Sequence, residues 1–464
     1  MRLAVVGNPE NRRVAQFVAA VERAGLRTPE IFPWRDVLLS GRVPGPGSLV
    51  RIDSPGENAE VDRLLRALGG DLAAEPAEHG EIIGGAAAFA GLRQALGTVA
   101  AGGGTLLNQP ADILTMTAKP RCHAVLSAAG IPVPPALKDG GTGTPAAKEG
   151  ATGIPSLEDG TTGTPTLKDG ATGTPAAKEG ATGIPSLEDG TTGTPTLKDG
   201  ATGTPAAKEG RTAVPSLEDG ATGVPAWEDD SGRASPGPVD SYLALRAAMR
   251  TAGWNRVFVK PAYGSSASGV LALAVGTGRR ILAVTSVELS QGRIFNNLRV
   301  RRYDDEESIA AIVDRLAGDG LHVERWYPKA ALDGRVLDLR VVVIAGRARH
   351  VVVRTSRSPM TNLHLGNARG DVAAVRAAAG ERAWDAAMRT CERAAECFPR
   401  TLHAGVDLMF RTGWREHAVA EVNAFGDLLP GVLSADGLDT YGAQVAAVLE
   451  GWPGADARHD PASG

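Results

Sequence analysis

The stretch GVDLMFRTGWREHAVAEVNAFG, residues 405–426, contains two apolar runs that flank the polar segment RTGWREH. This pattern predicts an antiparallel hairpin centred on Trp414, in which Asp407 lies directly opposite Glu421. Asn423 shares the face of Glu421, because side chains alternate along a strand. Facing carboxylates repel unless a cation neutralises them, and such oxygen donors suit Mg²⁺ or Mn²⁺ better than zinc. The alternative is a solvated polar face, although the neighbouring residues on both strands are apolar.

A second hairpin is predicted from VFVKPAYGSSASGVLALAV, residues 257–275. Its first strand ends near Lys260, and its loop, which includes Gly264, Ser265 and Ser266, consists of small residues. Small residues let backbone N–H groups approach phosphate oxygens, and the lysine adds a compact positive charge. A serine nucleophile elbow is excluded, because GSSASG does not match GxSxG and a strand follows it instead of a helix. The remaining alternative is a flexible hairpin tip with a surface lysine.

Two arginines are predicted on adjacent strands that are joined by the short turn AGR: Arg340 in LDLRV and Arg354 in VVVRTS. The spacing places them near each other on the ladder. Two neighbouring arginines without acidic partners indicate an anionic ligand. The alternatives are a solvated sheet face, or neutralisation of one arginine by Asp338. In the next segment, TNLHLGN, Asn362 and His364 are polar candidates on a loop.

Lysine is rare outside the segment 137–230: it occurs only at Lys119, Lys260 and Lys329, against 39 arginines. Lysine in a chain that otherwise uses arginine indicates positions that need a compact ammonium instead of a planar guanidinium, unless the choice is due to chance. Glu324 ends the predicted strand LHVE before two aromatic residues, a position suited to a nucleotide contact. Each of these residues alone is more often ordinary surface.

The segment from Leu137 to Trp227 runs in decads such as LKDGATGTPAAKEG, with proline at every tenth residue from 145 to 225. Frequent proline and glycine, with few large apolar residues, leave no core to bury. We therefore predict a disordered low-complexity insert over 137–238. Residues 137–230 contain 7 basic and 15 acidic side chains, a net charge of −8, so the remaining chain carries +4 of the total −4.

The length of 464 residues exceeds what one hydrophobic core usually fills and predicts about two or three domains. The net charge of −4 and the lack of a basic run give no reason to expect nucleic acid or an anionic membrane as a partner. No window approaches the ~18 apolar residues of a membrane span, and we expect a cytoplasmic protein. Cys122, Cys391 and Cys397 form no CxxC pair, which argues against a disulfide scaffold and a structural zinc site.

The N-terminal segments LAVVG, RRVAQFVAAVERAG, SLVRIDS and NAEVDRLLRALGG alternate between strand and helix patterns, which predicts an α/β domain. GxGxxG is absent here and GxxxxGK[ST] is absent throughout, so neither a Rossmann dinucleotide site nor a P-loop is supported. Farther along, strand-rich stretches alternate with helices twice, which predicts two α/β lobes with a cleft between them. The predicted helices include one continuous segment in NQPADILTMTAKPRCHAVLSAAG and others at about 239–251, 306–317, 369–397 and 438–451.

Together and in this order, these segments resemble the ATP-grasp superfamily. NQPADILTMTAK followed by GIPVP resembles its first lysine helix, VFVKPAYGSSASGV its second lysine and phosphate-covering hairpin, and VERWYP its nucleotide hinge. DLRVVVIAGRARHVVVR resembles its arginine strands, and GVDLM with AEVNAFGDLLPG its metal-binding strands. The resemblance covers roughly 108–135 and 239–432. It is greatest to the branch that contains the bacterial ligase adding glutamate to a ribosomal protein.

The resemblance implies an α/β fold (with α+β lobes) of the ATP-grasp type, preceded by an N-terminal α/β domain. The implied divisions are an N-terminal domain at 1–107, a central lobe at 108–136 plus 239–323, the insert at 137–238, a C-terminal lobe at 324–452 and a tail at 453–464. ATP and Mg²⁺ (or Mn²⁺) are the implied cofactors. The implied phosphate and nucleotide contacts are Lys119, Lys260, Gly264, Ser265, Ser266 and Glu324. The implied metal ligands are Asp407, Glu421 and Asn423, and Arg340 and Arg354 are the implied catalytic arginines.

The activity implied by the resemblance is ATP-dependent ligation of a carboxylate to an amine, or to a thiol, through an acyl phosphate, with release of ADP and phosphate. Positioning and charge neutralisation are what phosphoryl transfer requires. The expected partners are small-molecule or peptide carboxylate and amine substrates, with no nucleic acid and no membrane, and the oligomeric state is not predicted. The alternatives are a non-catalytic ATP-binding regulatory protein and an ATP-dependent phosphotransferase on the same fold.

Overall fold

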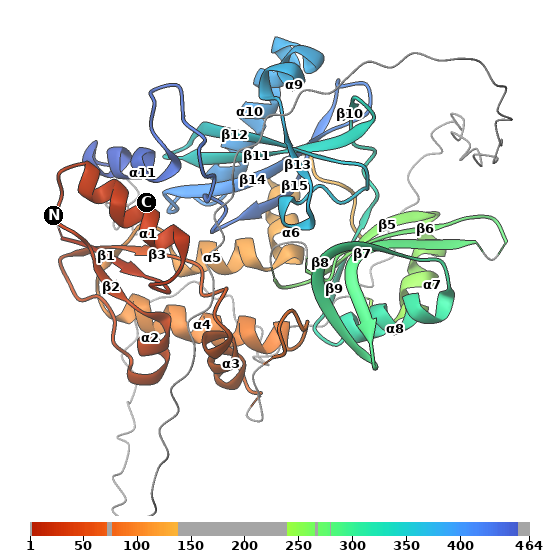
Figure 1. Cartoon of the computed structure of the whole chain (residues 1–464), viewed down its shortest axis with the longest axis horizontal. Coiled ribbons are helices and arrows are strands. Elements are labelled where there is room, and N and C mark those ends of the chain that lie inside the picture. Colours follow the sequence, from red (N-terminus) through yellow and green to blue (C-terminus); the bar gives the residue numbers. More distant parts are fainter. Residues whose placement is uncertain (1, 72–76, 138–238, 265–267, 279, 453–464) are drawn as a thin grey trace, which may run out of the picture. The chain divides into compact units, whose positions relative to one another are not determined.

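The computed structural model describes residues 2–71, 77–137, 239–264, 268–278 and 280–452. The predicted insert, apart from Leu137, and the tail at 453–464 lie outside these residues. In the described part, helices combine with one parallel and two antiparallel sheets (Figure 1). The prediction of a mixed α/β fold is therefore confirmed.

The N-terminal part contains the parallel sheet, whose strand order is β2-β1-β3-β4. Asn11 and Asn58 cap two of its helices, since each side chain accepts a backbone N–H of the first turn. Most of β1 is buried, as expected for a parallel strand covered by helices. The elements are β1 (Arg2–Val6), α1 (Arg12–Arg23), β2 (Glu30–Phe32), α2 (Trp34–Ser40), β3 (Ser48–Ile52), α3 (Ala59–Leu68), α4 (Gly85–Ala101) and β4 (Thr105–Leu106).

The central sheet is antiparallel, in the order β8-β7-β6-β5-β9. Two helices contribute buried apolar residues to its core: Leu245 and Met249 from one, and Ile309, Ile312 and Val313 from the other. The helix predicted at 306–317 is confirmed. The elements are α7 (Tyr242–Ala252), β5 (Arg256–Pro261), β6 (Leu271–Val275), β7 (Ile281–Ser290), β8 (Arg293–Tyr303), α8 (Glu306–Ala317) and β9 (Leu321–Arg325).

The C-terminal sheet is also antiparallel and has the order β13-β12-β11-β14-β15, with β10 paired to β11. The helices predicted at 369–397 are confirmed as two, of which the first begins at Val372; Gly380, with φ +78°, separates them. The elements are β10 (Ala331–Leu332), β11 (Arg335–Ile344), β12 (Arg347–Ser356), η1 (Leu363–Leu365), β13 (Ala368–Gly370), α9 (Val372–Ala379), α10 (Glu381–Glu396), β14 (His403–Phe410), β15 (His417–Asn423) and α11 (Thr440–Leu449).

The helix predicted as one segment before the insert is two helices, α5 (Pro110–Thr117) and α6 (Lys119–Ala128). Ala118 between them has ψ +97°, which breaks the helix. Pro120 in the first turn of α6 is the local reason that a new helix begins here, because proline is favoured at a helix start. The backbone N–H of Lys119 donates instead to the carbonyl of Ala262, at 2.9 Å.

The edge of the central sheet at β8 is covered by the chain that precedes α4. Ile82 N donates to Ile294 O at 2.9 Å, and Asn296 N donates to Gly80 O at 2.7 Å. Asp319, before β9, accepts the N–H groups of Gly85 and Ala86 at the start of α4. The segment before α4 is therefore joined to the central sheet by backbone hydrogen bonds. No helix among the described residues is long and apolar enough to span a membrane.

Candidate active site

The hairpin of β14 and β15 has the register that the sequence predicts. Asp407 lies opposite Glu421, and Gly405 lies opposite Asn423. A bulge just after Asp407 shifts the pairing by one residue toward the turn, where Trp414 has φ +63°. The prediction that Asp407, Glu421 and Asn423 occupy neighbouring positions on the two strands is therefore confirmed.

The two arginines have acidic partners, which corrects the expectation that they lack them. Arg340 lies opposite Asp407 on β14 and donates to both oxygens of that carboxylate. Arg354 lies opposite Asp338, to which it donates at 2.7 Å, and a second nitrogen lies 3.1 Å from Asp407. Burial opposes ionisation of Asp407, but the two guanidinium groups outweigh burial and lower its pKa. These cations supply the neutralisation that facing carboxylates require.

Asp338 is the centre of a buried network that also contains Lys329. The ammonium of Lys329 lies 3.4 Å from Asp338 and donates to the hydroxyl of Thr361 at 2.8 Å. Thr361 in turn donates to Asp338. Burial would raise the pKa of Asp338, but Arg354 and Lys329 outweigh it and lower the value to about 2. The network fixes the arginine strands against the loop that follows them.

Lys260 ends β5 inside the protein instead of on its surface. Its ammonium lies 2.7 Å from the carboxylate of Glu324 on β9 and 3.3 Å from the carbonyl of Ala420 on β15. His322 contacts the other oxygen of Glu324 at 2.9 Å. Burial would raise the pKa of Glu324, but Lys260 and His322 outweigh it and lower the value to about 2. The alternative of a surface lysine is wrong.

Lys119, the first residue of α6, extends toward the same place from the other side. Its ammonium donates to the carbonyl of Gly264 at 2.6 Å and lies 3.7 Å from Glu421. Burial lowers its pKa, and the charge of Glu421 acts in the opposite direction. Gly264 has φ +109°, which only glycine adopts without strain. The other two predicted loop residues, Ser265 and Ser266, lie outside the described residues.

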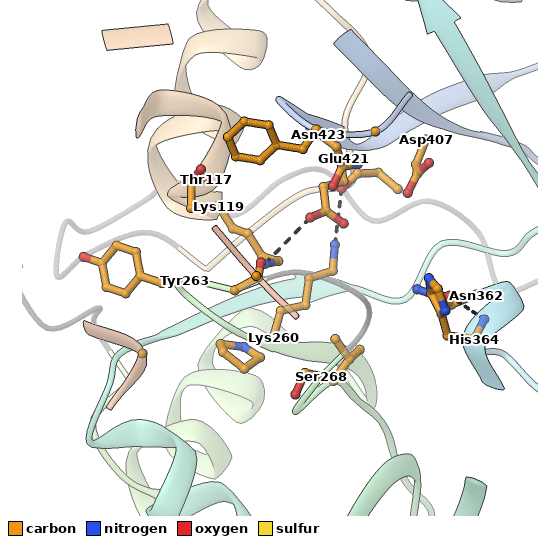
Figure 2. Close-up of a pocket in the computed structure, with 18 of the residues that line it drawn as sticks. Thr117, Lys119, Lys260, Tyr263, Ser268, Asn362, His364, Asp407, Glu421 and Asn423 are labelled. Atoms are coloured by element: carbon orange, nitrogen blue, oxygen red, sulfur yellow. Dashed lines mark hydrogen bonds and ion pairs between the residues drawn. The ribbon is translucent and has the colours of Figure 1, made fainter. Parts of the chain in front are cut away.

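A cavity of about 560 Å³ joins these groups. Every predicted site residue that the structure describes lines it, as do Lys329, Asn362 and His364. Figure 2 shows Lys119, Lys260 and Glu421 close together, with Asp407 nearby. All three lysines outside the segment 137–230 thus line one cavity.

The cavity also contains residues that the sequence reasoning missed. The ring of Tyr263, beside the phosphate-loop candidate Gly264, stacks on Phe89 of α4 with 4.3 Å between centroids. Arg13, in the first turn of the helix that follows β1, and Ser54, just after β3, line the cavity as well. Open parallel sheets bind ligands at such strand ends, but α4 itself was not predicted, so nothing pointed to Phe89.

The donor chemistry of the hairpin fits magnesium. Among the described residues, no group of three or more His, Cys, Asp and Glu side chains is placed to hold a metal. The hairpin offers two carboxylates and an amide instead, which are hard oxygen donors. The Asn423 amide nitrogen donates to Gly405 O at 3.4 Å, which leaves its oxygen available as a ligand. Three protein ligands would leave the remaining positions on the ion to water and phosphate, which is typical of Mg²⁺.

Searches of protein families and of curated proteins find no match to the chain. Solved structures do match. They include D-cycloserine synthetase DcsG, at 13% identity and a TM-score of 0.47, covering 97% of this chain and 100% of that one. D-Alanine–D-alanine ligase from Bacillus anthracis, complexed with ATP, matches at 12% identity and 0.41, covering 97% of each chain.

A RimK domain ATP-grasp protein from Sphaerobacter thermophilus DSM 20745 matches at 12% identity and a TM-score of 0.44, covering 97% of this chain and 100% of that one. All three matches have sequence identities of 13% or lower and TM-scores below 0.5.

Proposed function

We propose that this protein is an ATP-dependent ligase that activates a carboxylate as an acyl phosphate and transfers the acyl group to an amine. The observation that carries the proposal is the cavity in which two lysines and two arginines surround the carboxylates of Asp407 and Glu421. This density of charge suits a polyanionic substrate, because phosphoryl transfer is catalysed mainly by positioning and electrostatic stabilisation. A small-molecule or peptide carboxylate is the proposed acceptor of the phosphoryl group.

Lys260 and Lys119 are the proposed phosphate ligands. Glu324 holds Lys260 in position before nucleotide binds, since the pair is buried and 2.7 Å long. Lys119 contacts Gly264 O at the base of the small-residue loop, so phosphate binding to Lys119 is coupled to the position of that loop. We propose that the loop contacts the phosphates through its backbone N–H groups.

Asp407, Glu421 and Asn423 are the proposed ligands of Mg²⁺. The ion, when bound, would neutralise phosphate charge and act as a Lewis acid on the transferring group. Arg340 and Arg354 hold Asp407 in place through their hydrogen bonds. Their second proposed role is to stabilise the charge of the transferring phosphoryl group.

The proposed reaction has two steps. A carboxylate oxygen of the substrate attacks the γ-phosphorus of ATP, the bond to the β,γ-bridging oxygen breaks, and ADP leaves. An amine nitrogen then attacks the acyl carbon, loses a proton, and inorganic phosphate leaves.

Mass spectrometry of products formed from ATP, the purified protein and mixtures of cell carboxylates and amines tests this proposal. We expect a condensed product together with ADP and phosphate in equal amounts. A phosphorylated product without condensation would indicate a phosphotransferase instead. Tight ATP binding without any turnover would indicate a nucleotide-binding regulator.

A further inference from the structure

We propose that Arg51 of the N-terminal sheet is a positioning residue for the metal-binding hairpin and acts through Asp427. The inference rests on the proposed function, since it concerns the site at which Asp407 and Asn423 would hold Mg²⁺. Arg51 lies on β3, outside every segment that resembles the ATP-grasp motifs, and it does not line the cavity. Its effect on the site must therefore pass through other residues.

The Arg51 guanidinium is fully buried and bound on several sides. It donates to Asp427 Oδ2 at 2.7 Å and to the side-chain oxygen of Gln444 on α11. The rings of Phe17 and Tyr441 lie over it, at 4.9 and 5.3 Å from the centroids. A guanidinium held by hydrogen bonds and between rings has one position.

Asp427 connects Arg51 to the hairpin. Its carboxylate has no exposed surface, and Oδ2 accepts hydrogen bonds from both Arg51 and Gln444. Its backbone carbonyl accepts the hydroxyl of Thr440 at 2.7 Å. Burial opposes its ionisation, but Arg51, with His403 and Arg13, outweighs burial and lowers its pKa. Asp427 is thus a fixed anion four residues after Asn423.

The turn between Asn423 and Asp427 has no freedom to move independently. Gly426 N donates to Asn423 O at 3.3 Å, and Gly426 O accepts from Arg340 at 3.2 Å. A Cβ on Gly405 would lie only 2.7 Å from Gly426 Cα, so the two backbones are in direct contact. Gly405 lies opposite Asn423 in the hairpin. Asp427 therefore sets the position of Gly426, and Gly426 contacts both the guanidinium that binds Asp407 and the strand opposite Asn423.

The consequence is that a neutral residue at 427 should loosen the metal ligands without removing one. Arg51 would keep only Asp53, 3.5 Å away, as a buried counter-charge, and the turn would shift to relieve the loss of Asp427. Removal of a residue that holds a metal ligand in place typically weakens metal binding by about 10- to 100-fold. The nucleotide contacts at Lys119 and Lys260 lie on other elements and should be unaffected.

The test measures Mn²⁺ binding in the presence of saturating ADP by electron paramagnetic resonance, and ADP binding in EDTA by calorimetry, on the full chain. For Asp427→Asn we expect about 10-fold weaker Mn²⁺ binding with unchanged ADP affinity. Gln444→Met keeps the charge pair and a similar volume, so it should fold readily and show a smaller loss in the same direction. Arg66→Gln is the matched control. It also removes a buried guanidinium of the N-terminal domain, but Arg66 pairs with Asp62 instead of Asp427. It should leave Mn²⁺ binding unchanged.

A merely structural role would lower the melting temperature of Asp427→Asn and leave both affinities unchanged in the folded protein. Parent-like Mn²⁺ affinity in Asp427→Asn and Gln444→Met, with the parent binding Mn²⁺, would overturn the positioning role alone. Failure of the parent itself to bind Mn²⁺ with ADP would overturn the proposed metal site, and the positioning role with it.

Discussion

The ammonium of Lys260 lies 2.7 Å from the buried carboxylate of Glu324 on the adjacent strand. Both side chains are largely buried, at 12% and 6% exposed, and the ion pair offsets part of the cost of removing them from water. The pair sits at the entry of the small-residue loop, where a phosphate would compete with Glu324 for the ammonium. The ion pair should therefore affect two measurable quantities: the stability of the protein in acid and its affinity for nucleotide.

The Lys260–Glu324 ion pair should make the free energy of unfolding depend on pH in the acid range. The pKa of Glu324 is about 2 in the folded protein, against about 4.3 in an unfolded chain, so the folded state binds fewer protons. The resulting stabilisation, roughly 3 kcal/mol, is fully present above about pH 4.3 and is lost as the pH falls toward 2. Urea unfolding across this range should show a smaller pH dependence in the double variant Glu324→Gln/Lys260→Met. If the unfolding free energy of the double variant depends on pH as strongly as that of the parent, the Lys260–Glu324 ion pair does not supply this stability. Glu381→Gln, at an exposed ion pair, is the control.

Lys260→Arg should weaken ATP binding although it keeps the charge. The ammonium fits between Glu324 and the carbonyl of Ala420, and a longer planar guanidinium would displace one of them. Leaving one buried polar group unpaired costs about 1–3 kcal/mol, which corresponds to about 5- to 150-fold in affinity. Calorimetric titration with ATP measures this. Arg256→Lys, at the exposed start of the same strand, should bind ATP as the parent does. Equal affinities of Lys260→Arg and the parent would show that Lys260 does not contact the phosphates.

Asp407→Asn should reduce turnover by about 100-fold or more, because it removes the charge that two arginines and the proposed Mg²⁺ share. Initial rates of ADP release at saturating Mg²⁺ measure the loss, and circular dichroism verifies that the fold persists. Glu416→Gln, in an exposed ion pair at the hairpin turn, is the control on the same hairpin and should retain full rates. Parent-like turnover of Asp407→Asn would refute the metal assignment.

Replacement of residues 138–230 by a short Gly/Ser linker should preserve folding and ATP binding. Both ends of the segment are attached to the central lobe: Leu137 N donates to Val323 O at 2.9 Å, and Val239 is buried in the same core. Loop length changes closure entropy only weakly, so the free energy of unfolding should change little. Thermal unfolding and ATP titration of the shortened protein measure the outcome. Insoluble protein would show that the insert has a structural role.

The strand pairings within each hairpin could be predicted from sequence, whereas contacts between distant strands could not. Alternation and a central turn placed Asp407 opposite Glu421, because adjacent strands in sequence usually pair. Nothing local indicates that β11 lies beside β14, and the ion pair of Arg340 with Asp407 follows only from that strand order. The alanine- and glycine-rich α4 lacks a clear apolar stripe, so Phe89 was missed. The break at Ala118 was missed although Pro120 signals a helix start.

We expect the segment at 80–82, which is hydrogen-bonded to residues 294–296 of β8, to limit self-association at this edge. An uncovered edge strand presents a row of free N–H and C=O groups that pair readily with another copy. Leu298 and Val300 of β8 are exposed and apolar, so an uncovered edge would present apolar side chains as well as unpaired backbone groups. A chain that lost residues 77–83 would therefore expose more of this edge strand and should aggregate more readily.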